Sequence, residues 1–206
     1  MVPRHGTGMT VKSEIAPDHM QAAAVLFWQA FRGKLGPVMR PEAKALIFFE
    51  RVIDPTHVIT AVAADGALLG IAGFKTEKGS FVGGELSDLQ TAYGWFGGLW
   101  RGLLLSILER TVEADVLLMD GIVVSEAARG QGIGTLLLRA IKEEAVMRGC
   151  ASVRLDVIDS NPRAKALYER EGFAAGERTA LGPLRHLFGF RASTRMDCPI
   201  GRSETP

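Results

Sequence analysis

The chain has 206 residues, of which 47% are hydrophobic and 23% charged, and its formal net charge is +1. This balance is typical of an ordinary globular domain and gives no support for a broad nucleic-acid-binding surface. Cys150 and Cys198 are the only cysteines and form no CxxC pair, so free thiols in a reducing compartment are the simpler interpretation.

The first part of the chain predicts helices and a hairpin. The N-terminus has no apolar run, which argues against a secretory signal. The expected elements are a strand at 9–16, a helix at 18–31, a Gly-Pro loop at 33–41 and a helix at 41–53. Two apolar runs, 57–64 and 67–74, flank Asp65-Gly66, and this pattern predicts a β-hairpin.

A glycine-rich apolar segment follows at about 75–115. The part from Ser87 to Thr111 is predicted to be helical and to be broken at Gly94, Gly97, Gly98 and Gly102. Its most apolar stretch, 95–108, is too short to span a bilayer and carries Arg101, so we expect a cytoplasmic protein without an integral membrane segment.

The second half predicts alternating strands and helices. A buried strand is expected at 116–124, a helix at 132–148, an alternating strand at 151–158, a helix at 161–172 and two strands within 173–200. Residues 1–200 are therefore expected to form a single domain, followed by a polar tail at 201–206. An ideal helical wheel places Glu144 on the apolar side, which the pattern does not explain unless the last turn leaves the core.

The turn before the helix at 132–148 reads Arg129-Gly-Gln-Gly-Ile-Gly134. This sequence suits a pyrophosphate, because the first turn of a helix exposes unpaired N–H groups and glycines allow close approach of the backbone. Other phosphate loops fit poorly: the third glycine of GxGxxG falls on Thr135, and no GK[ST] is present. Taken alone, the pattern also fits a turn that binds no ligand.

The helix after the next strand has both ends marked in the sequence. Asn161 is a favourable N-cap, Pro162 suits the first helical position and Gly172 fits a left-handed C-terminal position. In such a terminus Phe173 packs near Tyr168. Tyr168 is then either a half-buried anchor or a functional residue.

These two segments resemble the acetyl-CoA site of GNAT acetyltransferases. Arg129-x-x-Gly132-x-Gly134 is similar to Q/R-x-x-G-x-G/A, and residues 161–173 follow N-x-x-A-x-x-L-Y-x-x-x-G-F. The resemblance implies an α/β (α+β) fold with a mixed, mostly antiparallel sheet and helices on both faces. The sheet would splay between the strands at 116–124 and 151–158, and the segment at 75–115 would be a helical insertion.

The resemblance also implies acetyl-CoA as co-substrate and an amine of a small molecule, peptide or protein as acceptor, without a metal. The pantetheine arm would lie between the splayed strands, held in part by Asn161, and the pyrophosphate would lie on the turn. The implied cofactor-binding residues are Ile122, Val123, Val124, Arg129, Gly130, Gln131, Gly132, Ile133, Gly134, Thr135, Asn161, Ala164 and Tyr168.

For the chemistry, the resemblance implies direct transfer in a ternary complex, with Tyr168 protonating the departing thiolate. An alkyl amine of pKa about 10 must first lose a proton. Asp120 is the candidate base, because alternation would place it on the face of Ile122 and Val124. The alternatives are a merely solvated or paired Asp120, water acting alone, or one of the carboxylates Glu50, Asp54, Glu85 and Asp88.

Neither cysteine resembles an activated nucleophile. The four histidines show no metal-ligand spacing, and His186 is expected either to border the acceptor pocket or to be simply exposed.

The apolar insertion would pack on the domain's own sheet, form a homodimer interface, line an acceptor pocket or lie on a membrane, in that order of preference. Two rival functions stay open. One is a sensor that binds acyl-CoA without catalysis, and the other is transfer of a longer acyl chain with the insertion as its tunnel.

Overall fold

The computed structural model describes residues 8–106 and 111–201, so Ile107, Leu108 and the tail at 202–206 lie outside the described part. The strands are β1 (Met9–Lys12), β2 (Val58–Ala63), β3 (Leu68–Thr76), β4 (Gly79–Ser80), β5 (Val116–Val124), β6 (Ser152–Ile158), β7 (Ala174–Ala180) and β8 (Ala192–Pro199). The helices are α1 (Met20–Met39), α2 (Glu42–Val52), α3 (Leu86–Tyr93), α4 (Trp95–Ser106), α5 (Ile133–Met147), α6 (Pro162–Arg170) and α7 (Arg185–Phe188).

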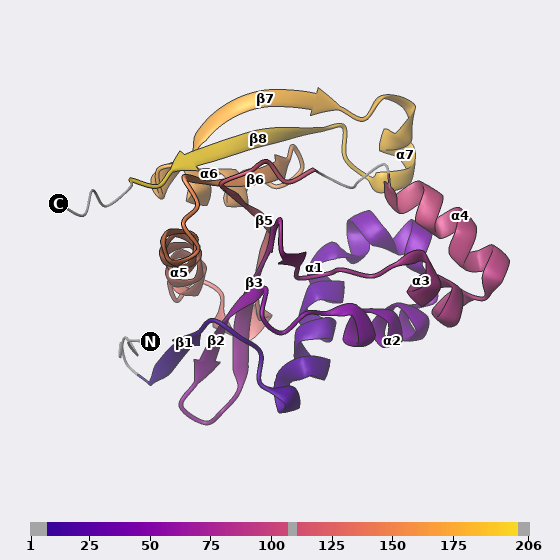
Figure 1. The fold of residues 1–206 in the computed structure, drawn as a ribbon, viewed down its shortest axis with the longest axis horizontal. Coiled ribbons are helices and arrows are strands. Elements are labelled where there is room, and N and C mark those ends of the chain that lie inside the picture. Colours follow the sequence, from indigo (N-terminus) through magenta and orange to yellow (C-terminus); the bar gives the residue numbers. More distant parts are fainter. Residues whose placement is uncertain (1–7, 107–110, 202–206) are drawn as a thin grey trace.

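One sheet runs through the molecule in the order β1-β2-β3-β5-β6-β8-β7, with β4 paired to β3 (Figure 1). Its neighbouring strands are antiparallel except β5 and β6, which are parallel. The expected hairpin is confirmed: Gly66 has φ +87° in the β2–β3 turn, and the Ala67 amide donates to the Asp65 carboxylate at 3.0 Å. The mixed, mostly antiparallel fold predicted from the sequence is therefore confirmed.

The two faces of the sheet bury separate apolar clusters, with helices on both sides as expected. One cluster joins α1, α2 and α3 to the sheet through residues such as Phe27, Phe49 and Ile71. The other joins α5 and α6 to the opposite face through residues such as Leu137 and Leu155. The alternation of β6 fits this division, because every second residue is buried from Val153 onward.

Helix α1 differs from the prediction at its C-terminal end. A loop was expected at 33–41, but the helix continues to Met39 with Pro37 inside it, so the loop assignment was wrong. Val38 and Met39 are almost completely buried in the cluster beneath α1. Burial of these side chains outweighs the low helix propensity of Gly36 and Pro37.

The insertion forms two short helices, and Gly94 with φ +78° is the break between them. The other predicted breaks were wrong, because Gly97, Gly98 and Gly102 lie inside α4. A Cβ on Gly98 would lie 2.5 Å from the Gln90 amide nitrogen, so the glycine allows α3 and α4 to approach closely.

The insertion packs mainly against helices of its own chain rather than directly on the sheet. Leu89 and Tyr93 of α3 are buried in the cluster of α1 and α2. The Arg101 guanidinium lies 4.0 Å from the centre of the Tyr93 ring and donates to the Arg40 carbonyl at 3.0 Å. The inner face therefore packs within the chain, but on α1 and α2 and not on the sheet as the preferred expectation had it.

The outer face of α4 carries large apolar side chains that stay exposed: Trp95, Phe96, Leu99, Trp100 and Leu103. This helix forms an edge of the molecule (Figure 1). Within residues 8–106 and 111–201, no helix combines the length and apolarity needed to cross a membrane.

Candidate active site

The predicted splay between the two parallel strands is present. The β5–β6 ladder begins at Val116 and Ser152 and ends at Met119 and Leu155, although β5 continues for five residues and β6 for three. Beyond this point β5 pairs only with β3 on its other edge. The backbone of Ile122, Val123 and Val124 therefore faces the opening between the strands.

A β-bulge at the same point changes the direction of the side chains. Gly73 pairs with Gly121 but Phe74 pairs with Met119, so Asp120 is the extra residue. A Cβ on Gly121 would meet Phe31 of α1 at 2.5 Å, whereas Met119 and Ile122 pack on the α5 side. The bulge interrupts strict alternation between Asp120 and Ile122, so the alternation argument does not hold across it.

The glycine-rich turn leads from β5 into α5 as expected. Gly130 and Gly132 have φ of +80° and +78°, a conformation that residues with a Cβ adopt only with strain. The Leu136 amide makes the first helical bond to the Gly132 carbonyl at 3.1 Å, so the amides of residues 133–135 point out of the helix end. Gly134 is tightly packed, because a Cβ there would lie 3.3 Å from Leu167 of α6.

The polar side chains of this turn are exposed. Arg129 lies 3.9 Å from the Glu126 carboxylate, and the Gln131 side-chain amide donates to the Ala127 carbonyl at 3.3 Å. Ile133, the first residue of α5, is buried, and Thr135 is half-buried in the same helical turn. The turn thus presents backbone N–H groups and the long cationic side chain of Arg129 to solvent. This arrangement suits the binding of an anion.

Helix α6 has the two predicted ends. The Asn161 side chain accepts a hydrogen bond from the Ala164 amide at 3.2 Å, and Gly172 has φ +89°. The Phe173 ring lies 6.0 Å from the Tyr168 ring, as expected for this terminus. Tyr168 is only 6% exposed, and burial raises the pKa of its phenol to about 12.

These residues meet at a cavity of about 900 Å³. Asp120 and Ile122 of β5 line it together with Asn161, Ala164 and Tyr168. The cavity extends from the split between β5 and β6 to the insertion, where Leu99 and other residues of α4 line it. The glycine-rich turn lies outside this lining, further along β5.

The other candidate bases lie elsewhere. Glu85 and Asp88 form a capping box at the start of α3, and Asp88 also pairs with Arg51 at 3.0 Å. Asp54 accepts hydrogen bonds from Thr56 and His57. None of these, nor Glu50, is among the described residues that line the cavity.

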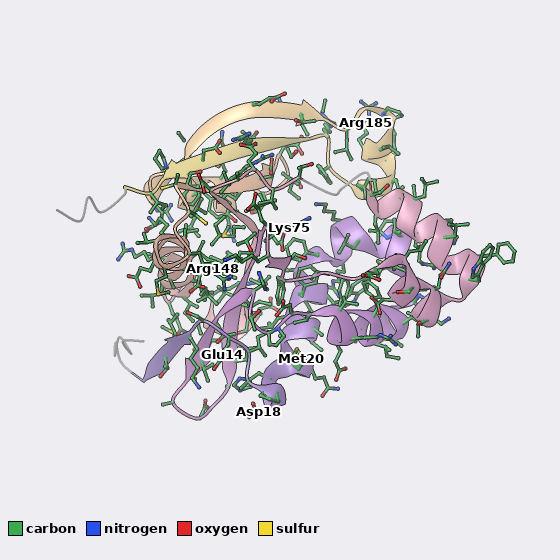
Figure 2. The ribbon with its side chains drawn as sticks, in the orientation of Figure 1. Glu14, Asp18, Met20, Lys75, Arg148 and Arg185 are labelled. Carbon is green, nitrogen blue, oxygen red and sulfur yellow. The ribbon has the colours of Figure 1, made fainter. Side chains whose placement is uncertain are left out.

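Sequence reasoning missed three charged residues of the cavity: Lys34 of α1, Lys75 of β3 and Asp156 of β6. Lys75 lies near the centre of the molecule in Figure 2. Alternation could have indicated Asp156, because it faces away from the buried Leu155 and Val157 on a strand that is paired on both edges.

The histidines and cysteines show no catalytic arrangement. His186 is exposed on α7 beside Arg185, while the nearby Phe188 and Gly189 line the cavity. Both thiols are free, as expected, and burial raises the pKa of each, which opposes thiolate formation. No group of three His, Cys, Asp or Glu suited to a metal ion occurs in the described part of the chain.

Known proteins share this arrangement. A family model for the acetyltransferase (GNAT) family matches residues 20–173. Thialysine N-epsilon-acetyltransferase from Sus scrofa is 38% identical over 154 residues, which cover 73% of this chain and 84% of that protein. The Bos taurus enzyme of the same name is 41% identical over 54 residues, and this match spans 26% of this chain and 32% of that enzyme.

Among solved structures, the fold is similar to that of a phosphinothricin acetyltransferase from Sinorhizobium meliloti in complex with acetyl-CoA. The TM-score is 0.59 at 14% identity, and the likeness covers 97% of this chain and 92% of that one. The matched family segment runs from the start of α1 to Phe173 and so contains both motifs and the split strands. The resemblance drawn from the two motifs is confirmed: the chain belongs to the acetyltransferase (GNAT) family, whose members transfer acyl groups from acyl-CoA to amines.

Proposed function

We propose that the protein transfers the acetyl group of acetyl-CoA directly to a primary amine in a ternary complex. The amine nitrogen attacks the thioester carbonyl, the carbon–sulfur bond breaks, and the products are an amide and coenzyme A. The observation that carries this proposal is the position of Tyr168, which lies in the cavity where β5 and β6 separate.

The coenzyme would lie along the opening between β5 and β6 and reach the glycine-rich turn before α5. The backbone of Ile122, Val123 and Val124 would pair with the pantetheine arm, and Asn161 and Ala164 would flank it. The pyrophosphate would lie against Arg129, Gly130, Gln131, Gly132, Ile133, Gly134 and Thr135. The outward amides of the turn and the positive φ of its glycines support this placement.

Tyr168 would act as the general acid. Since its pKa is about 12, the phenol keeps its proton at neutral pH and can give it to the departing thiolate. The bound ammonium group loses two protons on the way to the amide: the first leaves through the base to solvent, and the second restores the phenol, so the reaction is balanced without another reactant. Holding the amine and the thioester in one cavity supplies much of the remaining acceleration.

Asp120 would receive the proton of the bound ammonium group, directly or through water. The bulge brings its carboxylate into the cavity, and its position beside the split supports this role. Asp156 is the second carboxylate of the cavity and lies on the opposite strand of the split. Exchange of Asp120 for Asn would leave an unchanged pH–rate profile if Asp120 had no part in proton removal.

Tyr168→Phe tests the proposal. We expect kcat for thiol release to fall about 100-fold, the lower range of general acid catalysis, while the Kd of acetyl-CoA changes less than about twofold. Tyr93→Phe is the matched control. It removes the hydroxyl that donates to the Met39 carbonyl, so it should cost about 1 kcal/mol of stability and leave kcat unchanged. Equal losses of turnover and coenzyme affinity in Tyr168→Phe would mean that the tyrosine is only structural.

A further inference from the structure

The cavity has two chemically different ends. Among the described residues, its charged lining residues come from the sheet and α1: Lys34, Lys75, Asp120 and Asp156. The opposite end is lined by α2, α3, α4 and the segment before α3, and none of the described lining residues there is charged. The charged end lies beside Tyr168, where the proposed chemistry takes place.

The apolar end is large and depends on the insertion. Leu86 of α3, Leu99, Leu103 and Leu105 of α4 and Phe48 of α2 contribute to it. The whole cavity measures about 900 Å³, near the upper limit of small-molecule pockets. The proposed pantetheine arm takes the part at Ile122, Asn161 and Ala164, and an acetyl group with a small amine would leave the α4 end empty. The apolar lining also continues onto the surface, because Leu99 and Leu103 are exposed as well as lining.

We infer that the acceptor is a primary amine attached to a bulky apolar body, aromatic or branched aliphatic, which packs beneath α4. This inference rests on the proposed function and specifies its substrate class. The ammonium group would lie near Asp120 and Asp156, and the apolar body would fill the uncharged end.

A long acyl chain on the coenzyme is the other apolar group that could reach this end. The chemistry of the lining favours the acceptor. The lining combines charged residues of the sheet and α1 with apolar residues of α2, α3 and α4, and an amine with an apolar body has a group for each, whereas an alkyl chain has none for the charged residues. Asp120 and Asp156 can accept hydrogen bonds from an ammonium group, which an alkyl chain cannot donate.

A matched pair of exposed residues on α4 tests the inference. Leu103 is 72% exposed and lines the cavity, whereas Phe96 is 79% exposed and lies outside the lining. Both are replaced by serine, and neither change should affect folding because both side chains are mainly in solvent. The probes are 2-phenylethylamine and ethylamine as acceptors, and acetyl-CoA and octanoyl-CoA as donors.

For the wild type we expect kcat/KM for 2-phenylethylamine to exceed that for ethylamine by roughly tenfold or more, as is typical of an added apolar group in a complementary pocket. Leu103→Ser should reduce this ratio by about threefold or more and leave the KM of acetyl-CoA unchanged, while Phe96→Ser should keep the wild-type ratio. An unchanged ratio in Leu103→Ser, or no wild-type preference, would overturn the inference. A selective loss with octanoyl-CoA would also overturn it, in favour of the acyl chain.

Binding without turnover separates this inference from the proposed function. Calorimetry of 2-phenylethylamine with the coenzyme A complex should give weaker binding in Leu103→Ser than in Phe96→Ser, even if no amine is acetylated. Binding with that difference but without thiol release would contradict the proposed function alone. Thiol release with small amines, without any preference for the apolar amine, would contradict the substrate class alone.

Discussion

At the scale of single residues, two carboxylates, one buried and one partly exposed, show how charge is accommodated away from the cavity. Glu144, which the helical wheel placed on the apolar side, is indeed buried, so its turn does not leave the core. It pairs with Arg148 at 2.7 Å, and the Arg148 guanidinium lies 4.8 Å from the centre of the Phe74 ring. The pair explains how the carboxylate can remain in the core.

The second group, Asp54, gives a prediction about pH. Burial alone would raise the pKa of its carboxyl, but hydrogen bonds from Thr56 and His57 outweigh burial and lower the pKa below 3.8. The unfolded chain therefore binds this proton more readily. The stabilisation is complete above pH 3.8 and is lost as the pH falls through the pKa of the folded state.

In urea unfolding at pH 5 and pH 3, Asp54→Asn should lose less stability on acidification than the wild type. The difference should stay below about 1 kcal/mol, because the side chain is more than a third exposed and solvent screens it. Asp18→Asn, which replaces an exposed carboxylate just before α1, should follow the wild type. Identical acid sensitivity of Asp54→Asn and the wild type would contradict the assignment.

At the scale of elements, the contact between α3 and α4 depends on Gly98. A Cβ there would lie within 2.8 Å of three atoms of Gln90, two of them in the backbone. Gly98→Ala should therefore force the helices apart and cost about 1–3 kcal/mol in chemical denaturation. Gly33→Ala is the control: it lies in α1 with open space around its Cβ and should be neutral or stabilise by up to about 1 kcal/mol. Equal stabilities of the two variants would show that α4 does not need this close approach.

The elements also show where sequence reasoning succeeds. Strand β5 and helix α6 were predicted almost to the residue, because a continuous apolar run, the N-cap of Asn161 and the left-handed Gly172 are local signals. The end of α1 depends on burial of Val38 and Met39 by other elements. Local helix propensity carries no information about such burial. The bulge at Asp120 depends on the register with β3, so the sequence located the carboxylate but could not show the break in alternation beside it.

At the scale of the whole molecule, the proposed coenzyme site joins elements from both halves of the split sheet. β5 and α5 contribute one side, and β6 and α6 contribute the other, while the parallel ladder between them is short. The motifs revealed these elements because they are consecutive in sequence. They did not reveal the acceptor end of the cavity, which combines α1, α2 and the insertion from distant segments.

Binding across the split should stabilise the entire fold. Acetyl-CoA at a hundredfold excess over its Kd should raise the free energy of unfolding by about 2.7 kcal/mol, measured by denaturation with and without the ligand. NAD and ATP at the same concentration should have much smaller effects, since the turn lacks the sequences of their phosphate loops. Stabilisation by all three to the same extent would point to nonspecific anion binding.

The distribution of the tryptophans makes α4 accessible to a fluorescence measurement. Trp28 is buried, whereas Trp95 and Trp100 both lie on the outer side of this helix. Two of the three indoles are therefore exposed to solvent on α4. Iodide quenching of intrinsic fluorescence would report chiefly on α4, so the protein carries a built-in optical probe for movement of its insertion.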